Sequence, residues 1–255
     1  MRKRFNKLLV IAPLLVGNVA IAGDYTFTIG AEYTKGNYGA AIDTTMLQVP
    51  FTLGYNTEQY AWSVTVPYIQ ISGSEDVTFS GTTRSPKLST TTISSVMHSD
   101  SGLGDIALSG TYQLQKETKA RPWIAMTGKI KWATADEQKL LGTGENDYAA
   151  QLELAKKTLH GFFGYKIIGD SDTINYDNVF YAAAGVSIPA SKNWMTIIEL
   201  YTEQAAVSGV DNVQELSFTM SKALNDKNKL SIYIVKGLTN SSPDWGGGVT
   251  LSYSL

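Results

Sequence analysis

The feature that most constrains the fold is an alternation of apolar and polar residues that repeats along almost the whole chain. In residues 24–34, for example, the odd positions are Tyr, Phe, Ile, Ala and Tyr, and the even positions are mainly Thr, Gly and Glu. Alternation with a period of two is typical of a β-strand with one apolar and one polar face. The pattern recurs in twelve segments, near residues 24–34, 44–55, 60–71, 106–114, 124–132, 148–154, 163–167, 180–188, 194–200, 216–220, 230–234 and 249–255.

The segments have the length and spacing of strands that cross a membrane. A tilted transmembrane strand needs about 9–11 residues, whereas a membrane helix needs roughly 20 consecutive apolar residues. No such apolar run follows residue 22, and the links between segments alternate between short and long. Short turns on one side and long loops on the other are typical of bacterial outer-membrane barrels. We therefore predict an all-β protein, a transmembrane antiparallel up-and-down β-barrel of twelve strands.

The first 22 residues have the three parts of a secretory signal peptide. Basic residues within positions 2–7 precede a mostly apolar run, and Ala20-Ile21-Ala22 has the small-x-small pattern of a cleavage site. We predict residues 1–22 as a cleaved signal peptide and residues 23–255 as the outer-membrane β-barrel domain. The net charge of −2 excludes a strongly basic nucleic-acid binder. The absence of cysteine excludes a disulfide scaffold and a cysteine nucleophile.

Aromatic residues of the apolar faces gather near the strand ends. Amphipathic rings at the two membrane interfaces form aromatic girdles in outer-membrane barrels. The predicted girdle contains Tyr25, Tyr55, Trp62, Tyr112, Trp194 and Tyr253 on the short-turn side, and Tyr33, Tyr68, Trp132 and Tyr148 on the long-loop side. Strands are rich in aromatic residues in any case, but a soluble sandwich does not require them at both strand ends.

Charged and polar residues occupy the faces opposite to the apolar ones. A charge that faces lipid near the midplane costs about 2–4 kcal/mol, so we expect these residues to line the lumen. The candidates are Lys129, Lys131, Gln151, Glu153, Lys166, Glu199, Tyr201 and Glu215. Two interpretations are open. The three lysines could form the basic side of a path for an anionic or aromatic solute, or the charges could pair across strands and fill the lumen.

Two further features bear on the wall and the loops. Pro50 and Pro67 lie within strand segments, where each removes a ladder hydrogen bond, and we interpret them as bulge sites. The connection Ser72–Ser101 has 15 Ser or Thr among its 30 residues. It could fold inwards as a gate, with Val77 and Phe79 touching the lumen, or form a flexible surface loop.

Three stretches resemble a known family. They are GLGDIALSGTYQL (residues 102–114), PWIAMTGKIKWATADEQKLLGTGENDYAAQLELAK (residues 122–156) and SSPDWGGGVTLSYSL (residues 241–255). They are similar to the family called MetA-pathway of phenol degradation, which is described as outer-membrane transporters. The resemblance covers residues 25–255 and implies a transporter barrel with an association to aromatic catabolism in some members. It carries no catalytic residues.

These observations predict an outer-membrane channel or transporter of a Gram-negative bacterium, for passive passage of small molecules that include aromatic compounds. The alternation that continues to Leu255 looks like a targeting strand for the barrel-assembly machinery. Expected partners are that machinery, periplasmic chaperones, outer-membrane lipid, lipopolysaccharide and the small-molecule solute, with no nucleic acid. We expect no catalytic site, no metal and no cofactor.

Three alternatives remain open from the sequence. The first is a structural or surface-interaction barrel in the outer membrane whose lumen is blocked. The second is a barrel hydrolase built on His98, which Ser99 and Asp100 follow directly, because such enzymes need a His beside a Ser or an Asp. The third is a soluble β-sandwich, since it shares the alternation of apolar and polar residues.

Overall fold

Residues 24–78, 87–88, 96–170 and 176–255 are described in the computed structural model. The predicted signal peptide and Phe79 lie outside these ranges. The strands are β1 (Asp24–Gly36), β2 (Thr44–Asn56), β3 (Tyr60–Ser74), β4 (Val77–Thr78), β5 (Lys87–Leu88), β6 (Met97–Leu103), β7 (Ile106–Gln115), β8 (Trp123–Trp132), β9 (Asp147–Lys156), β10 (Leu159–Ile167), β11 (Val179–Pro189), β12 (Trp194–Glu203), β13 (Val213–Ala223), β14 (Asn228–Gly237) and β15 (Trp245–Ser254). One short 3₁₀ helix, Glu137–Lys139, lies between β8 and β9. Among the described residues, no helix has the length and apolar character to cross a bilayer.

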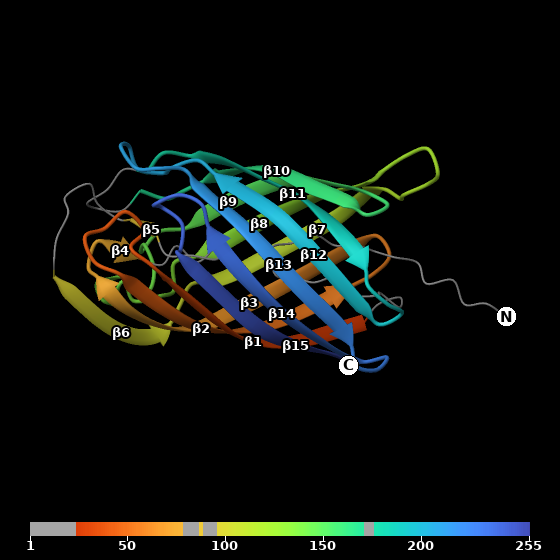
Figure 1. Cartoon of the computed structure of the whole chain (residues 1–255), viewed down its shortest axis with the longest axis horizontal. Helices are drawn as coiled ribbons and strands as arrows, with labels where there is room; N and C mark the ends of the chain where they lie inside the picture. The colour runs from red at the N-terminus through yellow and green to blue at the C-terminus, as the bar shows by residue number, and fades with distance from the viewer. Residues whose placement is uncertain (1–23, 79–86, 89–95, 171–175) are drawn as a thin grey trace.

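The strands form a closed antiparallel β-barrel. From β1 the sheet continues to β15 and then passes in descending order from β14 to β7. β7 pairs with β3, β3 pairs with β2, and β2 pairs with β1, which closes the ring. Twelve strands make the ring. β7 pairs with the first half of β3, from Tyr60 to Thr65, and β6 pairs with its second half, from Tyr68 to Ser74. Figure 1 shows the strands as tilted arrows that wrap around one axis, with β4, β5, β6 and the long connections at one end and the C-terminus at the other. The predicted fold is confirmed.

The register of the wall shifts in the β7–β8 ladder, between Gln113 and Gln115, and again where β3 changes partner. Thr65 pairs with Ala107 of β7, whereas Tyr68 pairs with Leu103 of β6. Three residues, 104–106, therefore face the two residues 66–67 of β3, and the extra residue is a β-bulge. Gly104 donates its backbone N–H to the carbonyl of Pro67 at 2.8 Å. A bulge is thus present at Pro67, as predicted, but its extra residue lies on the opposite segment, between β6 and β7.

The second proline lies directly across from the first. Pro50 of β2 pairs in register with Pro67 of β3. The β1–β2 ladder has register pairs on both sides of Pro50, at Ile29–Phe51 and at Glu32–Gln48, with none recorded between them. Because both pairs share one register, the ladder is interrupted at Pro50 without an inserted residue. The prediction of a bulge at Pro50 is wrong, because the missing proline N–H breaks the ladder without adding length to the strand.

The two faces of the wall differ in chemistry. The outer face carries exposed large apolar side chains on every strand of the ring, among them Phe27, Leu53, Phe163 and Ile234. The inner face carries buried and half-buried hydroxyl groups that pair between neighbouring strands: Thr28–Ser252, Thr52–Thr65, Ser63–Ser109, Thr111–Thr127 and Ser221–Ser231. An apolar exterior around a polar interior is the chemistry of a barrel that faces lipid outside.

Candidate functional site

The inner face holds all of the predicted lumen residues. Gln151, Glu153, Lys166, Glu199 and Glu215 are buried among inward-facing side chains. Lys131 is 0% exposed, and Lys129 and Tyr201 are half-buried on the same face of their strands. The structure thus brings these side chains to one surface, and their effect on a solute stays a prediction.

Lys131 is the centre of a buried ionic cluster at the long-loop end. Its Nζ lies 3.3 Å from Oδ2 of Asp105 and 3.3 Å from Oδ2 of Asp147, and it donates a 2.7 Å hydrogen bond to Thr143. Asp105 also accepts hydrogen bonds from the backbone N–H groups of Thr134 and Ala135. The Asp of the GLGD motif therefore joins β7 to the connection that follows β8.

A second polar network runs across β8 to β12. Lys166 donates to Glu203 at 2.9 Å, and Tyr201 donates its hydroxyl to the same carboxylate. On the neighbouring strands, the side chains of Thr127 and Gln151 both donate to Glu153. The ammonium groups of Lys129 and Lys166 also lie over the ring of Tyr181, at 5.7 and 5.8 Å from its centroid. These contacts give Lys166 a structural role beside any role in solute passage.

His160 forms a contact that the sequence does not reveal. Its Nδ1 lies 3.1 Å from Oγ of Ser187, and its Nε2 lies 3.5 Å from Glu199. The two partners come from β11 and β12, and Gly185 lies between them in the ladders. A Cβ at Gly185 would lie 2.5 Å from His160 Nε2, so the glycine makes the room that this contact needs. All three side chains are buried in the inner wall.

Among the described residues, the contacts of His98 are with Asp100 and Lys139. Its Nε2 lies 3.0 Å from Oδ2 of Asp100 and 3.3 Å from the carbonyl of Lys139. Ser99 sits between them on β6, and successive residues of a strand point to opposite faces. His98 and Asp100 are half-buried, whereas Ser99 is exposed. The three residues therefore form a His–Asp pair without the nucleophile of a triad.

The predicted girdle residues lie on the outer face of the wall. Tyr25, Tyr55 and Trp62 contact one another near the short turns, with ring centroids 4.9–6.3 Å apart. Near the long loops, Tyr33 packs against Trp245 at 5.2 Å, and Trp245 is a residue that the sequence analysis missed. Trp245 is the first residue of the last strand, and an aromatic residue at a strand end was the signal that could have identified it. The membrane role of these rings stays a prediction.

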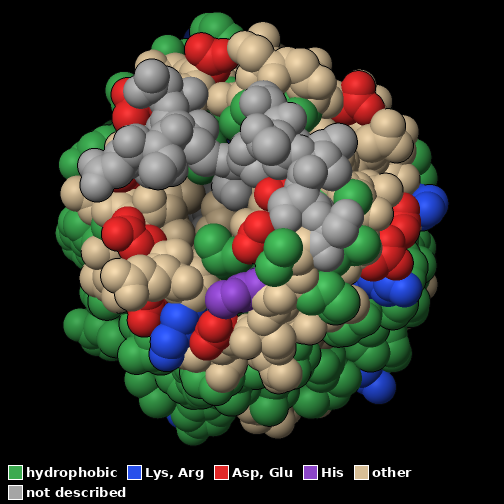
Figure 2. Space-filling model, turned by 90° about the vertical axis from the view of Figure 1, so that its left-hand side faces the viewer, with side chains coloured by type: hydrophobic (Ala, Val, Ile, Leu, Met, Phe, Trp, Pro, Cys, Tyr) green, Lys and Arg blue, Asp and Glu red, His purple; other side chains and the backbone are tan. Residues whose placement is uncertain are grey.

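Inward-folded connections cover part of the long-loop end. Val77 of β4 is 0% exposed and packs with Tyr38 and Ala40 of the β1–β2 connection, and Val210 of the β12–β13 connection contacts this cluster. Tyr38 also donates its hydroxyl to Thr34 at 2.9 Å. Figure 2, which faces this end, shows hydrophobic side chains around the periphery and acidic and other polar groups across the end. The β3–β6 connection thus folds inwards at Val77.

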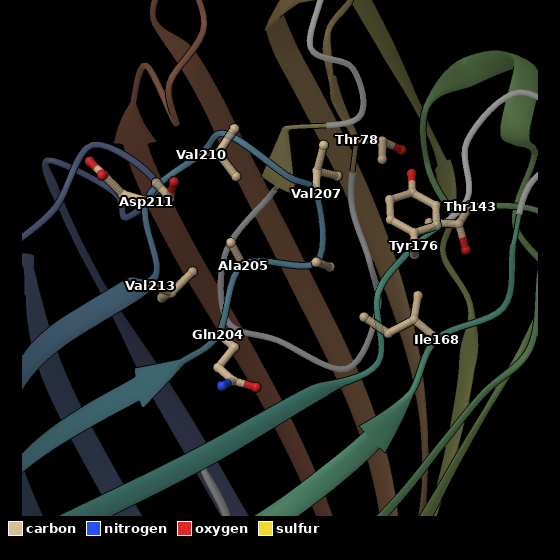
Figure 3. Close-up of a pocket in the computed structure, with 12 residues that line it drawn as sticks. Thr78, Thr143, Ile168, Tyr176, Gln204, Ala205, Val207, Val210, Asp211 and Val213 are labelled. Carbon is tan, nitrogen blue, oxygen red and sulfur yellow. The ribbon is translucent and has the colours of Figure 1, made fainter.

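An apolar pocket lies between five of the long-loop connections. The pocket is partly open to solvent, and apolar groups make up most of its surface. Figure 3 shows Ile168 and Tyr176 on one side and Val210 and Val213 on the other. The lining also includes Thr78, Thr143, Gln204, Ala205, Ala206, Val207, Asp211 and Ser241. Burial raises the pKa of Tyr176 to about 12.

Three solved structures are similar to this chain in fold. The CymD monoaromatic hydrocarbon channel is 10% identical, with a TM-score of 0.50, over 92% of this chain and 88% of that one. The toluene transporter TodX of P. putida is 8% identical, with a TM-score of 0.50, over 92% and 91%. The translocator domain of the autotransporter NalP from Neisseria meningitidis is 10% identical, with a TM-score of 0.51, over 92% and 88%. At these identities the likeness concerns the barrel fold.

Sequence comparison gives the family. No curated protein matches the chain. The family described as "Putative MetA-pathway of phenol degradation" matches residues 20–255. That match includes the whole barrel, the buried Asp105 of the GLGD stretch and the pocket residue Ser241 of the SSPDWGGG stretch. The chain belongs to this family of phenol degradation.

Proposed function

We propose that this protein is an outer-membrane channel through which small molecules, aromatic compounds among them, pass down their gradients. The observation that carries the proposal is the closed barrel with an apolar outer face, a polar inner face and an apolar pocket at the long-loop end. The family description concerns phenol degradation, and the fold is that of CymD and TodX, which are named as a hydrocarbon channel and a toluene transporter.

The proposal includes the route by which the barrel reaches its membrane. Residues 1–22 are the cleaved signal peptide, and the barrel-assembly machinery and periplasmic chaperones handle residues 23–255. The short turns face the periplasm and the long connections face the outside, because outer-membrane barrels place their longer loops on the extracellular side. The aromatic rings at both ends of the strands anchor the wall in lipid and lipopolysaccharide.

Conductance of the refolded barrel in a planar lipid bilayer tests the proposal. An open aqueous lumen predicts discrete current steps, and Lys129→Gln shifts their ion selectivity towards cations because it removes a positive charge from the inner face. Lys131 is unsuitable for this test because it holds the buried cluster. Lys222→Gln is the matched control, since Lys222 lies over the ring of Trp194 on the outer face.

The opposite result supports the blocked-lumen alternative. Silence from a barrel that is folded and inserted would reject an open lumen, and a structural or surface-interaction role would take its place. A selectivity shift of equal size in Lys129→Gln and Lys222→Gln would show that the current does not follow the inner face.

A further inference from the structure

The acidic residues of this chain gather at one end of the barrel. The six connections at the long-loop end contain 13 acidic and three basic residues, an excess of ten negative charges. These connections are residues 37–43, 75–105, 133–146, 168–178, 204–212 and 238–244. The five short turns at the other end, residues 57–59, 116–122, 157–158, 190–193 and 224–227, contain three acidic and six basic residues. Figure 2 shows acidic side chains near the centre of the long-loop end as well as at its edge.

Three lysines near the long-loop end are already paired with aspartates. The pairs are Lys35–Asp43 at 3.0 Å, Lys131 with Asp105 and Asp147 at 3.3 Å each, and Lys139–Asp136 at 3.9 Å. By contrast, Asp177 and Asp211 are exposed, and neither has a cationic partner among the described residues. Asp177 directly follows Tyr176 of the pocket lining, and Asp211 belongs to that lining. A solute that arrives at this mouth therefore meets carboxylates whose charge no lysine balances.

The inner face of the wall also carries more carboxylates than ammonium groups. On the described strands of the ring, six buried acidic side chains and four lysines occupy inward-facing positions. The acidic residues are Glu32, Asp147, Glu153, Glu199, Glu203 and Glu215, and the lysines are Lys129, Lys131, Lys166 and Lys229. Since Lys131 lies between two aspartates and Lys166 donates to Glu203, these lysines balance part of a negatively charged wall.

The excess of carboxylates determines the sign of the electric potential along the route of a solute. A cleft lined by charges of one sign concentrates solutes of the opposite sign, and rings of Asp and Glu side chains select cations in channels. We propose that this barrel selects solutes by charge: cations and uncharged molecules pass, and anions are excluded at the mouth, where Asp177 and Asp211 act. The proposal rests on the proposed function and deepens it, because it names the charge of the solutes that pass.

The reversal potential of the refolded barrel in a planar bilayer with a KCl gradient tests this selection. We expect K⁺ to be several-fold more permeant than Cl⁻. The preference should increase when the salt is diluted, because the Debye length grows from about 8 Å at physiological ionic strength to about 30 Å at about 0.01 M. Asp177→Asn combined with Asp211→Asn should lower the ratio of K⁺ to Cl⁻ permeability, and Asp177→Lys combined with Asp211→Lys should lower it further.

Asp177→Glu combined with Asp211→Glu is the matched control, since it changes the same side chains and keeps both charges. This pair should have the parent's reversal potential. A parent barrel that prefers Cl⁻ or neither ion would overturn the inference, and so would equal shifts in the Asn pair and the Glu pair. Each of these results leaves the channel intact, whereas silence from the inserted barrel would refute the channel and the selection together.

Phenyltrimethylammonium and benzenesulfonate extend the test to organic solutes, since they share a ring and carry fixed charges of opposite sign. We expect the cation to enter proteoliposomes several-fold faster than the anion, after subtraction of entry into protein-free liposomes. The Asn pair should narrow this difference, and the Glu pair should keep it. Equal entry of the two solutes, or faster entry of the anion, would contradict selection by charge.

Discussion

At the scale of single residues, the buried Lys131 cluster links β8 to Asp147 of β9 and to Asp105, which precedes β7, at the long-loop end. Within the described part of the chain, Oδ2 of Asp105 and Oδ2 of Asp147 have no hydrogen-bond partner, and the Lys131 ammonium lies 3.3 Å from each. Lys131→Met leaves two buried carboxylates without a cation. We expect a loss of about 3–5 kcal/mol in the free energy of unfolding, measured by urea titration in detergent with the mobility shift of the folded barrel as readout.

A compensating variant separates the charge effect from the loss of packing. In Lys131→Met combined with Asp105→Asn and Asp147→Asn, no buried charge is left unpaired, so part of the lost stability should return. A single Lys131→Met variant with the parent's urea midpoint would contradict the ionic role of the cluster.

The glycine beside His160 gives a second residue-scale prediction. In Gly185→Ala the new Cβ would lie 2.5 Å from His160 Nε2 and 2.5 Å from the carbonyl oxygen of Ile198. Because the second atom is backbone, the wall itself must shift, and we expect a loss of about 1–3 kcal/mol. Gly110→Ala is the control, since nothing lies within 4 Å of its added Cβ. Equal urea midpoints for the two variants would refute the close packing at Gly185.

At the scale of the elements, the strands and the connections differ in how far the sequence predicts them. The alternation in residues 24–34 lies within a single segment, and every strand of the ring has such a pattern. Each strand could therefore be predicted from its own residues. The contact of Tyr38 with Val77 joins connections that are distant in the sequence, and no local pattern encodes it. The pocket likewise draws Thr78, Ile168 and Ser241 from separate connections, which is why the sequence did not reveal it.

The inward fold of the β3–β6 connection has a direct test. Val77→Asp places a charge in the apolar cluster with Tyr38 and Ala40, where an unpaired charge costs several kcal/mol. We expect the connection to leave the mouth, so that protease added outside the vesicles cleaves it several-fold faster. Val96→Asp, at a position that is 54% exposed in the same connection, should have the parent's rate. Identical cleavage of both variants would contradict the inward packing of Val77.

At the scale of the whole molecule, the two faces of the wall determine what the barrel can do. The sequence predicts which residues lie on the inner and which on the outer face, because a strand puts alternate residues on opposite sides. It did not show that Lys166 would join Glu203, or that His160 would join Ser187, since these contacts depend on the strand register and on the closure of the ring. The inner face is therefore a set of polar networks, with the apolar pocket above them at the long-loop end.

The most direct test of the channel is uptake of labelled phenol by porin-deficient Gram-negative cells that display the folded barrel. The channel predicts an initial rate of phenol uptake several-fold above that of cells with an empty vector. Val210→Trp, which puts a larger side chain into the lining of the pocket, should reduce this rate when the variant is displayed at the same level. A trisaccharide should enter all three strains at one rate if the outer membrane is intact. Equal phenol uptake by cells with and without the folded barrel would contradict the proposed function.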